Sequence, residues 1–197
     1  MEEKKLDAAE SLALIGRMIE NTRNQLERNA GRPFLVWGYT TFVLTIVIWS
    51  LVSIFQDGRW NILWILLPVA GGGLMYFTRP KTDEGKVYTF VDRVIGQVWL
   101  VFGLSGGFVS TLTVFSSIRI PIFFTILLLM GLGTLLTGMI IRFRPVIVGG
   151  AIGVVLAPIT LLVPQNWIAG LFAAGFVAMM IIPGHILNYK SNHPQQA

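Results

Sequence analysis

Residues 121–144 read PIFFTILLLMGLGTLLTGMIIRFR, with no charged side chain between Pro121 and Ile141 and an arginine at both position 142 and position 144. An α-helix of about 20 such residues spans the roughly 30 Å hydrocarbon layer of a bilayer. Lysine and arginine concentrate at the cytoplasmic ends of membrane-spanning helices. The segment therefore predicts a transmembrane helix that ends at Arg142 on the cytoplasmic side.

Five other segments share this composition. The six expected spans are residues 33–55, 60–78, 94–115, 121–141, 145–163 and 167–187, and none contains Asp, Glu, Lys or Arg. The whole chain is 54% hydrophobic and only 13% charged, whereas a soluble domain carries about 25% charged residues. We therefore expect an all-α membrane protein, a six-transmembrane-helix bundle of three hairpins over residues 33–187. Residues 188–197 would form a cytoplasmic tail.

The basic residues predict the orientation. Thirteen of the fifteen fall on the side of the N-terminus, and only Arg59 and Arg119 fall on the other. Such a bias places the lysine-rich and arginine-rich connections in the cytoplasm, so both termini are expected there. The basic residues lie beside apolar spans instead of on one soluble face, and no direct nucleic-acid binding is expected.

The segment before the first span has a different pattern. Asp7 and Glu10 form a capping-box spacing, and apolar residues then recur in steps of three and four, which predicts an amphipathic helix. Gly31 is expected to end this helix, with Pro33 in the first turn of the next. Residues 1–32 would thus be a separate cytoplasmic helix. The candidate partner or membrane face consists of Leu12, Ile15, Ile19 and Leu26.

Three coverings for that apolar stripe are compatible with the sequence. The stripe could pack under the protein's own bundle, lie in the lipid interface, or pair with another chain. It is only about three heptads long, and Thr22 interrupts it, so a coiled coil is not favoured.

A Gly-x-Ser-x-Gly pattern occurs at Gly103, Ser105 and Gly107. It resembles the GxSG motif of rhomboid proteases, which pair a membrane serine with a histidine on another helix. His185 would lie roughly 12 Å from Ser105 along the bilayer normal at 1.5 Å per residue, too far for a catalytic pair. We interpret the pattern as close helix packing through small residues. The expected packing residues are Gly103, Ser105, Gly107, Gly149 and Gly153.

No catalytic, cofactor or metal site is predicted. The chain has no cysteine, which excludes thiol nucleophiles and cysteine-ligated metals, and its two histidines are too few for a convincing zinc site. The expected spans hold no ionisable group except His185, which argues against a proton-coupled pump. The chain is therefore expected not to be an enzyme.

Residues 18–39 read MIENTRNQLERNAGRPFLVWGY. This stretch resembles a family of small, uncharacterised bacterial integral membrane proteins with six spans. In that family, an M-I-x-x-[ST]-[KR] helix leads into F-L-x-W-G-[WY]. The resemblance implies a bacterial inner-membrane location but no activity, because the family has none established. It also implies a partner by gene context alone, a cytoplasmic winged-helix regulator.

These observations lead to two functional hypotheses. The first is a non-enzymatic sensing, regulatory or scaffold protein acting through its N-terminal helix. The alternative is a transporter or facilitator of a small neutral solute or lipid. The lipid bilayer is a partner in both, and a homo-oligomer is compatible with either.

Overall fold

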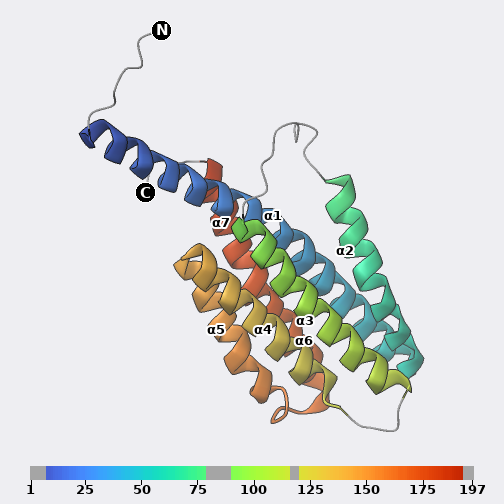
Figure 1. Ribbon diagram of the computed structural model, residues 1–197. Coiled ribbons are helices and arrows are strands. Elements are labelled where there is room, and N and C mark those ends of the chain that lie inside the picture. Colours follow the sequence, from blue (N-terminus) through green and yellow to red (C-terminus); the bar gives the residue numbers. More distant parts are fainter. Residues whose placement is uncertain (1–7, 79–89, 116–119, 193–197) are drawn as a thin grey trace.

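The computed structural model describes residues 8–78, 90–115 and 120–192, with side chains from Gly31 onward apart from Val114, Ser191 and Asn192. All regular structure in these residues is helical, which confirms the all-α class. In chain order the elements are α1 (Ala8–Phe55), the 3-10 helix η1 (Gly58–Ile65), α2 (Leu66–Phe77), α3 (Phe90–Phe115), α4 (Ile122–Ile141), α5 (Arg144–Ile159), α6 (Gln165–Phe176), the π-helix η2 (Val177–Ile181) and α7 (Ile182–Asn192). Figure 1 shows them as one elongated bundle.

The first helix is longer than the sequence pattern predicts. α1 runs unbroken for 48 residues with Pro33 inside it, so the expected break at Gly31 is wrong. Pro33 lacks the N–H that would bond one carbonyl in the preceding turn, and its ring crowds that carbonyl. Gly31 lies against α7, where a Cβ atom added to it would be 3.2 Å from Leu187 Cβ. Tertiary packing thus keeps the helix continuous through a glycine that would otherwise favour a stop.

In the residues that the structure describes, five helical segments are long and apolar enough to cross a membrane, and the remaining expected span, at residues 145–163, is shorter. Its α-helix, α5, has 16 residues and rises about 24 Å, less than the roughly 30 Å of a hydrocarbon core. The chain tightens after it, because the Leu161 and Leu162 amides donate to carbonyls three residues back. The predicted span at residues 145–163 is therefore a short helix followed by a turn.

Two prolines explain the non-α segments. Pro68 cannot donate to the carbonyl of Trp64, and α2 begins at Leu66, which places Pro68 in a first turn where its missing N–H costs little. Upstream, the chain forms η1. Pro183 likewise cannot donate to the carbonyl of Met179. The turn before it widens into η2, where the Ile182 amide bonds the carbonyl of Val177.

The core centres on the closest helix pair, α4 and α5. Three glycines lie where the two backbones touch, in one antiparallel register. A Cβ added to Gly150 would lie 2.4 Å from Leu135 N, one on Gly138 would lie 2.6 Å from Ile147 N, and one on Gly131 would lie 2.7 Å from Val154 N. Leu127, Val146 and Met179 complete the buried cluster around this pair.

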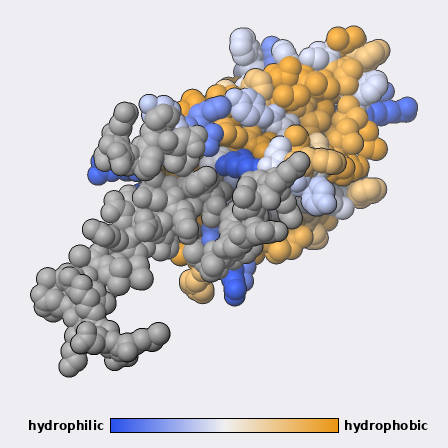
Figure 2. Space-filling view, turned by 90° about the horizontal axis from the view of Figure 1, so that it is seen from above, coloured by the Kyte–Doolittle hydropathy of each residue, from blue (hydrophilic) through white to orange (hydrophobic). Residues whose placement is uncertain are grey.

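By contrast, α2 and α3 lie at the edge of the bundle. α3 packs mainly against α4, and α2 mainly against α1. Their apolar side chains face outward, and Phe77 and Phe90 are 84% and 80% exposed. Figure 2 shows the resulting hydrophobic surface over much of the bundle. Such a surface is stable in lipid and unstable in water, which fits a membrane protein.

Candidate functional site at the base of the N-terminal helix

The helix α1 is held by α7 at the point where it leaves the bundle. Gly31 has no side chain, and a Cβ there would be 3.3 Å from the Asn188 amide as well as close to Leu187. Gly184 returns the contact, since its own Cβ would be 2.9 Å from Leu35 Cδ2. Leu187 is fully buried at this crossing. The two helices therefore touch nearly backbone to backbone.

On its other side α1 is held by the end of α2. The Arg32 Nη2 atom donates to the Met75 carbonyl at 2.7 Å and to Thr78 Oγ1 at 2.8 Å, and Nε donates to Thr78 Oγ1 at 3.2 Å. The last carbonyls of a helix lack intrahelical partners and carry partial negative charge, so a guanidinium is favourable there. One planar side chain thus closes α2 and fixes it to α1. We call Gly31, Arg32, Met75, Thr78 and Leu187 the α1 collar.

Further along α1, a polar contact again reaches α7. The Tyr39 hydroxyl lies 2.8 Å from His185 Nε2, a hydrogen bond in which the donor depends on the imidazole tautomer. Their rings meet edge to face with centroids 5.8 Å apart. Trp37 covers Gly71 of α2, where an added Cβ would meet the indole ring at 2.5 Å. Beyond the collar, α1 therefore still contacts both α7 and α2.

This arrangement gives the N-terminal part of α1 a fixed base. Residues 8–30 continue the same helix beyond the bundle (Figure 1). Because a continuous helix is stiff, a shift of α2 or α7 at the collar would change the direction of those residues. The collar thus joins α1 to both α2 and α7 at one level of the bundle.

Removing the Arg32 guanidinium is expected to release the end of α2. In Arg32→Met the apolar stem remains, but the bonds to Met75 and Thr78 are lost, at a cost of about 1.5 kcal/mol for a part-buried charged hydrogen bond. Amide hydrogen exchange over α2 should become faster. In Arg32→Lys the exchange rate over α2 should lie between those of the wild-type protein and Arg32→Met, because an ammonium keeps the charge but lacks the planar fork of a guanidinium.

Arg59→Met is the matched control, since it removes an exposed cation from η1, just before the start of α2. It should leave exchange over α2 unchanged. Equal exchange in Arg32→Met and the wild-type protein would show that the guanidinium does not hold α2.

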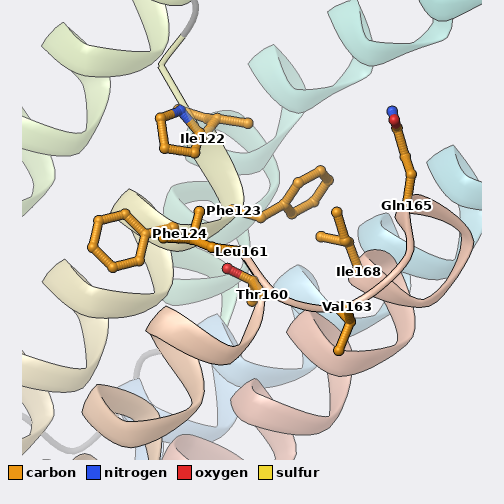
Figure 3. Close-up of a pocket in the computed structure, with 9 residues that line it drawn as sticks. Ile122, Phe123, Phe124, Thr160, Leu161, Val163, Gln165 and Ile168 are labelled. Carbon is orange, nitrogen blue, oxygen red and sulfur yellow. The ribbon is translucent and has the colours of Figure 1, made fainter.

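A second feature lies at the opposite end of the bundle, between the start of α4 and the turn that joins α5 to α6. This open cleft has a volume of about 370 Å³ and is lined mainly by apolar side chains. In Figure 3, Phe123 points toward Ile168, while Gln165 points away from the other lining residues. The Thr160 hydroxyl already donates to the Ala157 carbonyl at 2.6 Å. Among the described residues that line the cleft, none is charged, and Gln165 and Thr160 carry the polar side chains.

The two expected glycine pairs have different surroundings in the structure. Gly149 and Gly153 are buried, and a Cβ on either would lie 2.9 Å from an atom of the η2 and α7 region. At Gly103 and Gly107, an added Cβ would meet no atom within 4 Å. A Cβ at either of these two positions would therefore point into open space among the described residues. Gly106 faces α4 instead, since a Cβ added to it would lie 3.3 Å from Ile126 Cδ1.

The remaining expected residues are placed as follows. Ser105 is partly buried on α3, and His185 is bonded to Tyr39 instead. Leu12, Ile15, Ile19 and Leu26 lie on α1, outside the side chains that the structure describes. Within the described ranges, no group of three or more His, Asp or Glu side chains has the geometry to hold a metal.

Sequence reasoning missed Arg32, Tyr39, Gly131, Gly138 and Gly150. The seven-residue spacing of Gly131 and Gly138 was a usable signal for a close helix contact.

Comparisons of the chain with protein-family models, curated proteins and solved structures give no match.

Proposed function

We propose that this chain is a bacterial inner-membrane protein with six spans in three hairpins and both termini in the cytoplasm. The distribution of thirteen basic residues against two supports that orientation. In this arrangement α5 is the fifth span and is shorter than the others, and the α1 collar lies at the cytoplasmic surface of the membrane.

The protein we propose is non-enzymatic, and it acts in sensing, regulation or scaffolding through residues 8–30 of α1. One observation carries this proposal, the continuity of α1 through Gly31 and Pro33. Forty-eight residues extend about 72 Å at 1.5 Å per residue, and the apolar part, Gly31–Phe55, needs only about half of that length to cross the bilayer. The remainder is an arm rigidly joined to the membrane domain.

Continuity also bears on what covers the apolar stripe of the arm. A break at Gly31 would let residues 8–30 fold back under the bundle, whereas an unbroken helix directs them away from it (Figure 1). The stripe of Leu12, Ile15, Ile19 and Leu26 then needs another surface. We propose a cytoplasmic protein as that surface, and the resemblance described above suggests a winged-helix regulator.

The interior supports this proposal over transport. Leu127, Thr134, Thr137 and Met179 are fully buried between the helices. Proton- and ion-coupled carriers keep ionisable groups within their spans, and the described core has none. Its polar residues are threonines such as Thr45 and Thr137, whose hydroxyls bond to carbonyls in their own helices.

Photocrosslinking of the full chain in native membranes tests the proposal. A photoreactive residue at Ile19, within the stripe, should form an adduct with a cytoplasmic protein, and one at Asn24, on the opposite face, should not. The comparison keeps the helix, the distance from the membrane and the probe constant.

Three results would overturn the proposal. Adducts confined to lipid would mean that the arm lies on the membrane surface. Adducts within the same chain would mean that it packs on its own bundle. Adducts with periplasmic proteins would place the N-terminus on the wrong side.

A further inference from the structure

A groove between α5 and α7 opens on the outer surface of the bundle, near the end that carries the collar. It has a volume of about 390 Å³, within the range of small-molecule sites. Its apolar walls and floor are formed by Val148, Ile152, Ile182, Ile186, Gly149 and Pro183. Val148 and Ile182 are 57% and 52% exposed, so these walls face the surrounding lipid.

The groove results from the contact of α5 with the π-helix. At Gly149 a Cβ would lie 2.9 Å from both the Ala178 carbonyl oxygen and Pro183 Cγ. Pro183 has no N–H to offer that carbonyl. Because Gly149 has no side chain at this crossing, the larger residues on either side of it form the walls of the groove.

Arg144 lines one end of the groove, and its side chain is exposed. Arg144, Val148 and Ile152 are four residues apart, so they follow one face of α5 over about 12 Å. Arg142 is also exposed at this end, and Lys190 lies over the Phe143 ring at 5.5 Å from its centroid. The sequence contains no Asp or Glu after Asp92. The helices α4, α5 and α7 therefore contain no acidic residue, while Arg142 and Arg144 place two exposed cations at this end.

We infer that this groove binds one anionic phospholipid, with the phosphate beside Arg144 and an acyl chain along Val148 and Ile152. A single cation at one end of an apolar channel complements an amphiphile with an anionic head. Arginine suits a phosphate because its planar fork donates two parallel hydrogen bonds. The inference rests on the membrane placement proposed above, but not on any partner of the N-terminal arm.

Lipid binding to the purified full chain in detergent tests the inference by native mass spectrometry. Phosphatidylglycerol should bind about fivefold more tightly than phosphatidylcholine with the same acyl chains, as expected for one interfacial arginine. Arg144→Gln should remove that preference. Arg93→Gln is the matched control, because it removes an exposed cation from α3, which does not line the groove, and it should keep the preference.

A second variant tests the apolar part of the groove separately from the charge of Arg144. Val148→Trp fills the groove from an exposed position and should weaken the tight binding of one phosphatidylglycerol while leaving thermal stability unchanged. Equal binding of the two lipids by the wild-type protein would overturn the inference. An equal loss in Arg93→Gln would do the same, because it would mean diffuse attraction to net charge. Glycerol 3-phosphate that competes as well as the whole lipid would show an anion site without an acyl-chain channel.

Discussion

Gly150→Val is expected to lower the free energy of unfolding by about 3 kcal/mol or more, at or beyond the upper end for overpacked cores. The new Cβ would lie 2.4 Å from the Leu135 amide nitrogen and 2.6 Å from its Cα. These are backbone atoms of α4, so no rotamer change can relieve the clash. The two helices must separate along the whole contact, including the close approaches at Gly131 and Gly138.

The loss should be large because packing is the main force between helices in a membrane. Lipid tails are as apolar as side chains, so burial alone does not hold helices together there. Small residues let the α4 and α5 backbones gain dispersion contacts over their length. A separation of even 1 Å forfeits a good part of those contacts.

Gly170→Val is the control for this prediction. Gly170 is an exposed glycine of α6 with no atom within 4 Å of an added Cβ, so the same change in volume and helix propensity meets open space. Unfolding by a denaturing detergent, followed by tryptophan fluorescence, should give a wild-type midpoint for Gly170→Val and a strongly lowered one for Gly150→Val. Equal midpoints for the two variants would contradict the close α4–α5 contact.

The sequence predicts the helical class because long uncharged runs have few other solutions in a bilayer. Details set by tertiary contacts are not predictable in this way. Gly31 followed by Pro33 is a good local stop signal, yet the packing of Gly31 on α7 keeps α1 continuous. The shortness of α5 depends on a tightened turn at Leu161 and Leu162, which no hydropathy pattern marks.

The site was less predictable than the fold. Arg32 counts in the sequence as one of thirteen basic residues that set orientation, and its bonds to Met75 and Thr78 join positions more than 40 residues apart. The spacing of Gly103 and Gly107 satisfies the same small-residue rule as that of Gly149 and Gly153. Among the described residues, an added Cβ meets a neighbouring helix at the second pair and not at the first, because the motif specifies a smooth surface and not its partner.

Ile15→Glu combined with Ile19→Glu is expected to expose the N-terminal arm while the membrane spans still insert, since no residue of the spans changes. Burial of each isoleucine is worth about 1.5–3 kcal/mol, and a buried carboxylate adds a further penalty. Most of a helix's stability in a protein comes from packing of its amphipathic face, and the double variant removes that packing from the arm. Backbone hydrogen exchange over residues 8–28 in native membrane vesicles should therefore become about a hundredfold faster or more.

Asn21→Glu combined with Asn24→Glu is the matched control for the arm. It adds the same two negative charges to the same helix, but on the face opposite the stripe. Its exchange should stay slow, because the covering of Leu12, Ile15, Ile19 and Leu26 is untouched. Fast exchange over residues 8–28 in the wild-type protein itself would mean that nothing covers the stripe. The arm would then be an exposed tail joined to a rigid base, and the regulatory proposal would lose the surface through which it acts.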